Sequence, residues 1–354
     1  MDLPSELILL MFETFIVYDV EEDQIDVEAR RTLRNLCLTN RRFRCLAEPS
    51  LYKSFVSSRR TSPPTSDGPV TIWTRLLRWV SRQPPKKLSV SQPSTSALCK
   101  TVQARPEIAT LIQTIRLSPW KRPKSWSTLH PTEYAKIIYL LLKAKNLKHL
   151  TIAIPRITKR VVEDAYLEQL FLRAPYPTLP PTYLIELWLD HLHTVCINFS
   201  THKLTPDGAY INITPGIFQI PTLRHLTLHQ LHEAYESDTY QMPVQCSNIT
   251  HLFLKECVIG LTTIQNLLGA CKALQSISIV SNEIPWYHYY GDYGWDIFDS
   301  TITWPALRRA FAVHKVTLKV LHVDLVAFWP AIDSDETFGH KELREFTALE
   351  DLRI

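Results

Sequence analysis

Histidine is the residue type whose placement most invites a chemical interpretation in this sequence. His149, His225 and His251 each directly precede the middle member of a recurring apolar triplet, so their rings are expected at equivalent places in successive structural units. Imidazoles gathered in this way could bind a metal ion or titrate near neutral pH. Neighbouring strands would separate the rings by about 4.8 Å per step, and Glu186 interrupts the series. We therefore interpret each as a repeat-position residue on a half-exposed strand and expect no metal site.

The cysteines, the glycines and the absence of known motifs exclude several further kinds of site. The seven cysteines are widely spread and form no C-x-x-C pair, which indicates reduced thiols of the cytosol or nucleus rather than a disulfide framework or a zinc ribbon. Eight of 354 residues are glycine, and no G-x-G-x-x-G or G-x-x-x-x-G-K-[ST] phosphate loop occurs. Neither G-x-S-x-G nor H-E-x-x-H is present. We expect a protein that has no catalytic residues and needs no cofactor.

A repeated apolar pattern in residues 111–354 indicates the elements that position the three histidines. The pattern L-x-x-L-x-L, with Ile or Val allowed, occurs eight times, and helical runs stand between its copies at 133–145, 162–174, 263–272 and 306–315. A strand alternates faces with a period of two, so the last two apolar members of each triplet point into one core. One strand and one helix per unit predict an α/β solenoid with a curved parallel sheet and outer helices. The triplets are Ile112/Ile115/Leu117, Leu147/Leu150/Ile152, Leu184/Leu187/Leu189, Leu223/Leu226/Leu228, Ile249/Leu252/Leu254, Leu274/Ile277/Ile279, Leu318/Leu321/Val323 and Leu349/Leu352/Ile354.

The residues on either side of each middle leucine are expected to face away from the core, on the concave side of the sheet. Curved solenoid faces are commonly used for binding, and exposed Trp, Phe, His and Arg suit a protein partner. The aromatic insertion 284–298 either adds to this surface or covers the end of the neighbouring unit. The candidate target-binding residues are His149, Trp188, His225, His251, Phe253 and His322 on the sheet, and Trp286, Tyr290 and Trp295 in the insertion.

Residues 1–55 predict a small helical module. Proline and an acidic residue open a first helix, a second run places Leu33 and Leu36 on one side, and Asn40 can cap a third helix. Three short helices form a core too small to cover all the apolar side chains of this segment. The module is therefore expected to need a partner.

Four motifs in this module resemble the F-box family: Leu3-Pro4-x-Glu6-Leu7-Ile8, Leu36-Cys37-Leu38, Arg41-Arg42-Phe43-Arg44-x-Leu46-Ala47 and Pro49-x-Leu51-Tyr52. Thr39-Asn40 departs from the family's pattern. The resemblance implies docking onto the Skp-type linker protein of a cullin ubiquitin ligase; an unrelated helical hairpin that begins with Leu-Pro is the alternative. The docking residues that it implies are Leu3, Pro4, Leu7, Ile8, Leu36, Leu38, Arg42, Phe43, Leu46 and Leu51.

The unit 248–271 resembles the cysteine-containing leucine-rich repeat found in F-box proteins. This resemblance implies that Cys257 is buried at a turn and bonds backbone groups. An ordinary parallel α/β sheet is the alternative fold. We predict an F-box over 1–55, a linker and basic helical segment over 56–97, and an irregular leucine-rich-repeat domain over 98–354, which stops at Ile354 without the polar capping unit that solenoids usually need.

Charge is distributed unevenly along the chain. Residues 1–55 carry 7 basic and 10 acidic side chains, residues 56–150 carry 17 and 3, and residues 151–354 carry 15 and 22. We interpret the basic block as a solvated surface, because no stacking-aromatic or recognition-helix pattern accompanies it, and keep nucleic-acid binding as an alternative. No apolar run is long enough to span a membrane.

These observations together lead to a functional expectation. By resemblance, the chain is a non-catalytic adaptor of a Skp–cullin–F-box ubiquitin ligase, cytoplasmic or nuclear, whose repeats hold a target protein that the sequence does not identify. The alternatives are a repeat-based interaction scaffold acting outside a ligase and a nucleic-acid-associated protein using residues 56–150.

Overall fold

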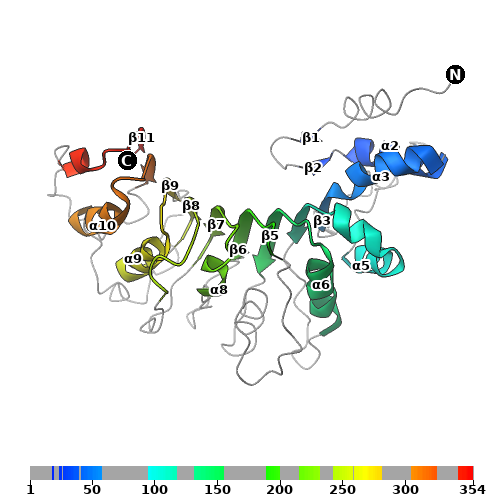
Figure 1. The fold of residues 1–354 in the computed structure, drawn as a ribbon, viewed down its shortest axis with the longest axis horizontal. Coiled ribbons are helices and arrows are strands. Elements are labelled where there is room, and N and C mark those ends of the chain that lie inside the picture. The colour runs from blue at the N-terminus through cyan, green and yellow to red at the C-terminus, as the bar shows by residue number, and fades with distance from the viewer. Residues whose placement is uncertain are drawn as a thin grey trace, which may run out of the picture.

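A nine-stranded parallel sheet organises the chain (Figure 1). The computed structural model describes residues 18–19, 24–25, 27–39, 41–57, 95–117, 131–154, 189–199, 215–231, 242–257, 259–280, 304–324 and 342–353. The strands lie in the sheet in the order in which they occur along the chain, which gives an α/β, solenoid-like fold. They are β3 (Ser54–Ser57), β4 (Thr114–Leu117), β5 (His149–Ile154), β6 (Thr194–Phe199), β7 (His225–His229), β8 (His251–Lys255), β9 (Ser276–Val280), β10 (Val320–Val323) and β11 (Asp351–Arg353).

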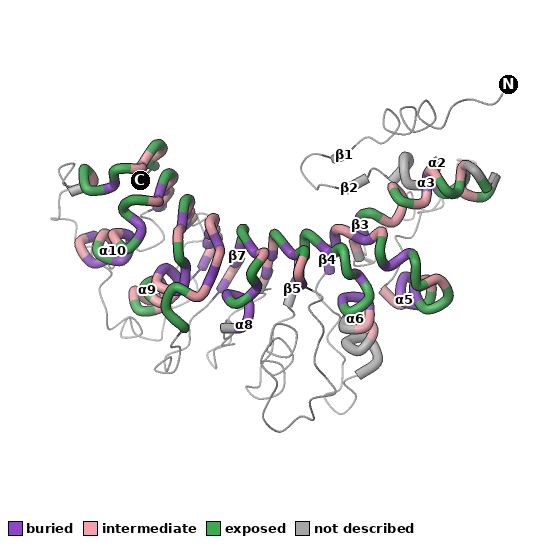
Figure 2. The backbone as a smooth tube through the Cα atoms, viewed as in Figure 1, coloured by how far each residue is buried: buried purple, intermediate pink, exposed green. Residues whose placement is uncertain are grey.

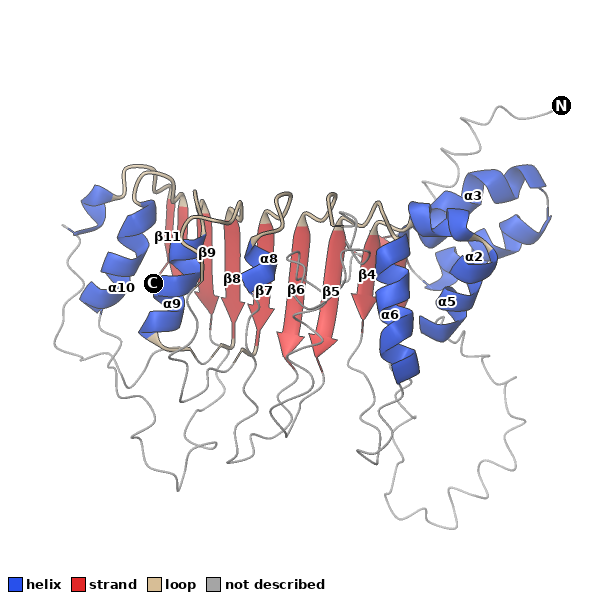
Figure 3. Ribbon diagram, turned by 60° about the horizontal axis from the view of Figure 1, so that its bottom comes forward, coloured by secondary structure: helices blue, strands red, loops and turns tan. Residues whose placement is uncertain are grey.

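The described helices cover one face of this sheet, and the opposite face carries none of them (Figure 3). The sheet curves away from the helices, so that the face without helices is concave (Figure 1). A pair of helices stands at the β3 end, next to the short antiparallel strands β1 (Tyr18–Asp19) and β2 (Gln24–Ile25). The helices are α2 (Val27–Thr39), α3 (Arg41–Lys53), α5 (Thr95–Ala104), α6 (Pro131–Lys143), α8 (Pro215–Phe218), α9 (Leu261–Ala270) and α10 (Trp304–Phe311), with the 3₁₀ helices η1 (Pro106–Leu111), η6 (Ala312–His314) and η8 (Glu342–Glu345).

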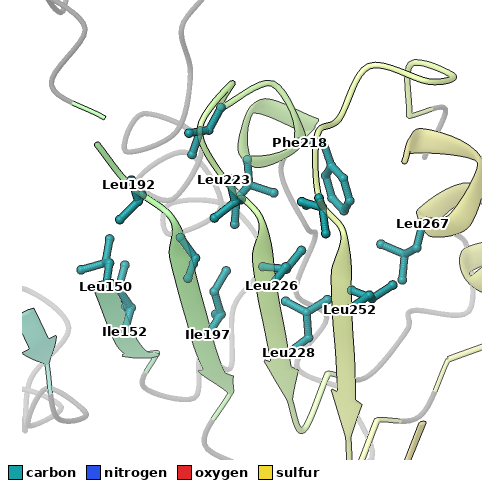
Figure 4. Packing of buried hydrophobic residues seen from close by; sticks show 14 of the residues in the cluster. Leu150, Ile152, Leu192, Ile197, Phe218, Leu223, Leu226, Leu228, Leu252 and Leu267 are labelled. Atoms are coloured by element: carbon teal, nitrogen blue, oxygen red, sulfur yellow. The ribbon is translucent and has the colours of Figure 1, made fainter. Parts of the chain in front are cut away.

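The core lies between the sheet and its helices, where the period-two pattern predicts it. Residues along β7, β8 and β9 are buried alternately, and Figure 2 shows this alternation along the sheet. Figure 4 shows Leu226, Leu228 and Leu252 on the same side of the strands as Leu267 of α9. In β11, by contrast, Leu352 is exposed. Six predicted triplets are buried throughout: those that begin at Ile112, Leu147, Leu223, Ile249, Leu274 and Leu318.

A repeated backbone contact holds each strand in register with the next. The carbonyl of Lys148 accepts the N–H groups of both His193 (2.8 Å) and Thr194 (3.0 Å). The same forked contact occurs at every step from β4 to β11, so one carbonyl just before each of β4 to β10 fixes the start of the next strand. The accepting carbonyls are those of Gln113, Lys148, His193, Arg224, Thr250, Gln275 and Lys319.

Leu184 and Leu187 of the predicted triplet Leu184/Leu187/Leu189 lie outside the described residues, and a later segment forms the strand between β5 and β7. That place is taken by β6, which pairs directly with both neighbours, while Leu189 lies in the turn before it. The core residues of this unit are instead Leu192, Val195 and Ile197. Thr194 and Cys196 therefore occupy the outward positions that the sequence assigned to Glu186 and Trp188.

The sheet begins much earlier in the chain than the repeats predicted from residue 98. Helix α3 ends at Lys53, and β3 begins at the next residue and pairs with β4. Phe55 is buried in the main core, and Tyr52 packs against it. The helical module thus runs directly into the first strand, and the chain joins the sheet again at β4.

The prediction for Cys257 is confirmed. Its side chain is 8% exposed, and its Sγ donates to the carbonyls of Leu228 (3.3 Å) and Lys255 (3.4 Å). Burial raises the pKa of this thiol to about 12, so it stays protonated and serves as a backbone donor at the end of β8.

His314 links two units within the core. Its side chain is 2% exposed; Nε2 lies 2.9 Å from the carbonyl of Leu268, and Nδ1 accepts the N–H of Leu274 at 3.5 Å. Because Nδ1 accepts, the ring carries its proton on Nε2 and is neutral. Burial lowers its pKa, and the bond to Leu268 opposes this only in part.

We therefore expect the free energy of unfolding to fall as pH drops below about 6.5, since the unfolded chain binds a proton there that folded His314 does not. In His314→Gln, whose amide does not titrate, the fall is smaller. Urea unfolding at pH 7.5 and 5.5 measures both, and an equal loss in the two proteins would contradict this role.

Candidate functional site

The concave face of the sheet brings together the sheet residues singled out from the sequence. We call the outward positions of β4–β10 the bare face. Its first row runs through His149, Thr194, His225 and His251 in successive strands, and its second through Cys196, Thr227 and Phe253. His322 lies in the second row on β10. The structure thus places five predicted residues on one face: His149, His225, His251, Phe253 and His322.

The remaining target-binding candidates cannot be placed on this face. Trp188, Trp286, Tyr290 and Trp295 lie outside the described residues.

Two histidines of the bare face stack on each other. The rings of His225 and His251 have centroids 4.3 Å apart and planes inclined by 27°. Parallel pairing of β7 and β8 puts the two residues in direct register. Nδ1 of His251 lies 2.9 Å from the hydroxyl of Thr250, which donates to the carbonyl of Arg224 at 3.3 Å.

Partial burial keeps both stacked imidazoles mostly neutral at neutral pH. Partial burial lowers the pKa of His225, and the neighbouring His251, His149 and His193 lower it further. The pKa of His251 is also lowered, by partial burial. As the pH falls, protonation makes both ring nitrogens of each histidine donors.

Cys196 lies at the middle of the bare face but is not arranged as a nucleophile. Burial raises its pKa, although Arg116 on β4 and Lys255 on β8 act in the opposite direction. A thiol with a raised pKa is mostly protonated at neutral pH and therefore reacts poorly. Both cations lie close enough to act on the centre of the face.

A cluster of polar side chains lies beside the bare face, at the ends of β7 and β8. Nε2 of His229 lies 3.0 Å from Oε2 of Glu256, and Nε2 of Gln230 donates to the same oxygen at 2.8 Å. Gln230 and Glu256 adopt left-handed φ angles of 60° and 52° at the turns after β7 and β8. These contacts lower the pKa of Glu256 against the raising effect of its burial. The carboxylate is therefore ionised and already has its partners.

Several polar residues of the site were not predicted from the sequence. Lys148, His193 and Arg224 stand at the strand starts, directly before the first row. Thr194 and Cys196 were missed with β6. A signal for this strand was present, because Leu192, Val195 and Ile197 match the same spacing as the accepted triplets.

The helical module forms a second candidate site at the β3 end. Leu33 and Ala47 are its fully buried pair, and Leu36, Cys37, Phe43, Leu46 and Leu51 pack partly exposed around them. Leu38 is 70% exposed at the end of α2. The described helices thus leave Leu38 exposed and five further apolar side chains only partly buried. Leu3, Pro4, Leu7 and Ile8, and the side chain of Arg42, lie outside the described residues.

An ion pair joins this module to the rest of the chain. Arg105, between α5 and η1, donates from both terminal nitrogens to Glu48 of α3, with Nη2 2.8 Å from Oε2. Its Nε donates to Glu107 at 2.8 Å. The two-pronged geometry orients α3 as well as attracting it. Bonds from both carboxylates raise the pKa of Arg105.

Among the described residues, no group of three or more His, Cys, Asp or Glu side chains could hold a metal ion. None of the described helices has the length and hydropathy to cross a membrane. Comparison of the chain with protein-family profiles, curated proteins and solved structures finds no match. A function is therefore inferred from the geometry of the bare face and of the helical module.

The histidine stack makes a prediction that can be measured by nuclear magnetic resonance. With ¹³C-labelled histidine, the ring of His225 should titrate with a midpoint below 6.5, and His251→Ala should raise that midpoint because it removes a cationic neighbour. His322→Ala, two strands away from β8, is the matched control and should leave it unchanged. A midpoint at or above 6.5 in the unchanged protein would refute the assignment.

The ion pair of Glu48 and Arg105 makes a second prediction. Arg105→Ala should increase amide hydrogen exchange in α3 by about threefold, because a partly exposed pair contributes modestly to local stability. Exchange in α9 should stay constant. Arg309→Ala on α10 is the control and should not change α3; unchanged exchange of α3 in Arg105→Ala would show that the pair does not hold the helix.

Proposed function

We propose that this protein is a non-catalytic, substrate-recognition adaptor of a Skp–cullin–F-box ubiquitin ligase. In this proposal the helical module is an F-box that docks onto the Skp-type linker protein, and an irregular leucine-rich-repeat domain holds the target. The linker in turn joins the adaptor to a cullin, and the complex works in the cytoplasm or nucleus. Its mechanism is positional, because tethering raises the effective concentration of target lysines near the ligase.

The observation that carries the proposal is the excess of apolar surface on the helical module. Two helices of 13 residues each bury Leu33 and Ala47 completely, while Leu38 stays 70% exposed. An exposed leucine beside a group of partly buried apolar side chains on a small helical unit favours a protein partner. Leu36, Leu38, Phe43, Leu46 and Leu51 are the described docking residues.

The connection between module and sheet suits an adaptor. No residue lies between α3 and β3, because the helix ends at Lys53 and the strand begins at Ser54. The pair Glu48–Arg105 adds a second attachment from α3 to the start of η1. A partner docked on the module would therefore have a defined orientation relative to the bare face.

The bare face is the natural place for the target in this proposal. It is concave and carries none of the described helices (Figure 3). It presents His225, which is exposed and stacks on His251, and it presents His251 and Phe253 with partial exposure. Aromatic and imidazole side chains with backbone positions fixed by a sheet bind with little loss of conformational entropy.

Leu38→Asp tests the docking role without disturbing the fold, because the side chain is exposed. We expect the Skp-type linker protein to co-purify with the unchanged chain and its recovery to fall more than tenfold with Leu38→Asp, since burying one leucine contributes about 2 kcal/mol to binding. Quantitative pull-down with purified linker protein measures this.

Val316→Asp is the matched control, because Val316 is 66% exposed and lies after η6 near the other end of the sheet. It should leave recovery of the linker unchanged. Equal recovery with both variants, or no binding by the unchanged chain, would refute the adaptor proposal.

A further inference from the structure

The placement of β6 changes the electrostatics of the bare face. The sequence had put Glu186 in the first row between His149 and the histidine of β7; the structure puts Thr194 there. With that change, no outward position of β4–β10 is acidic. The row of residues directly before these strands, from Gln113 to Lys319, contains no acid either.

Lysine and arginine residues occupy several outward positions of the strands and several positions directly before the strands. Arg116 and Lys255 lie on the face, one on either side of Cys196, and both act electrostatically on that thiol. Lys148 and Arg224 stand at the starts of β5 and β7. Arg224 donates through Nη1 to three backbone carbonyls, those of Pro221, Leu223 and Asn248, which orient its guanidinium but do not neutralise its charge.

Three described carboxylates at the borders of the face are engaged, and Asp324, directly after β10, is a further acid there. Glu256 is bound by His229 and Gln230. At β11, Glu350 pairs with Lys319 at 2.9 Å, and Asp351 pairs with Arg353 at 3.2 Å. The turn before β6 carries Asp190, the single acid in the four turns 144–148, 189–193, 219–224 and 245–250.

We infer that the bare face binds an acidic, extended segment of a partner protein, which crosses strands β4–β8. This inference takes the face's target-binding role from the proposed function and adds the chemistry of the target. Carboxylates of the segment pair with cations drawn from Lys148, Arg224, Lys255 and Arg116, and the stacked rings of His225 and His251 lie beneath its end on β7 and β8. Complementary charge of this kind sets partner choice and the rate of association.

The dimensions of the face fit a short peptide. Five parallel strands at about 4.8 Å spacing span about 19 Å from β4 to β8, and an extended chain covers that distance with about six residues. Alternate side chains of the segment point at the sheet, so about three of them meet it directly. Thr151, Thr194 and Thr227 provide hydroxyl groups between the cationic positions.

The closing experiment uses the full chain and a fluorescein-labelled deca-glutamate peptide. We expect binding by fluorescence anisotropy at 50 mM salt that weakens as salt is raised. Lys148→Glu with Lys255→Glu should weaken it at least tenfold. Lys100→Glu with Lys315→Glu makes the same change in net charge at exposed positions on α5 and after η6, and should weaken it less than twofold.

Three outcomes would overturn the inference. They are no binding of deca-glutamate, an equal loss in the two double variants, and tighter binding of a labelled decathymidylate, which would assign the charge to nucleic acid. Recovery of the Skp-type linker protein, measured on the same double variants, distinguishes failure of this inference from failure of the proposed function. Lys148→Glu with Lys255→Glu should still bind the linker protein. Leu38→Asp should lose the linker protein and still bind the peptide.

Discussion

The forked hydrogen bond at the start of each strand is the contact on which the rest of the structure depends. One carbonyl holds two N–H groups of the next unit, from Gln113 through Lys319, and so fixes the register of neighbouring strands. Side chains alternate with a period of two, so a slip of one residue would expose every buried leucine and bury every outward polar group. The register also explains why chain segments of unequal length between strands are compatible with a continuous core.

The period-two pattern predicted most of the sheet, because six of its triplets are buried throughout. It placed one strand wrongly, since two segments with the same spacing lie close together and only pairing with β5 and β7 selects the second. It missed β3 because Tyr52, Phe55 and Ser57 stand where other units have aliphatic residues. Local sequence reports which residues can face a core; which of two candidates does so is decided by neighbouring strands.

The sequence predicted many of the residues that form the candidate site, but it did not predict how their side chains lie relative to one another. His225 and His251 were expected at equivalent positions, yet their stacking follows from the pairing of β7 with β8 and the bond of His251 to Thr250. Similarly, Thr194 takes the first-row position that the sequence pattern gave to Glu186, so no carboxylate stands between His149 and His225. Electrostatic character depends on which residues share a face, so an error of one strand in the pattern changes the expected chemistry of the whole surface.

The direct passage of α3 into β3 has a consequence for how such a chain can change over evolutionary time. Exchanging the helical module for another at its apparent sequence boundary would also remove or interrupt the first strand. β4 would then present its unpaired backbone groups to solvent, a surface that favours aggregation. The module is therefore not a freely interchangeable cassette, and a viable recombination would have to include residues 54–57, whose Phe55 completes the core at that end.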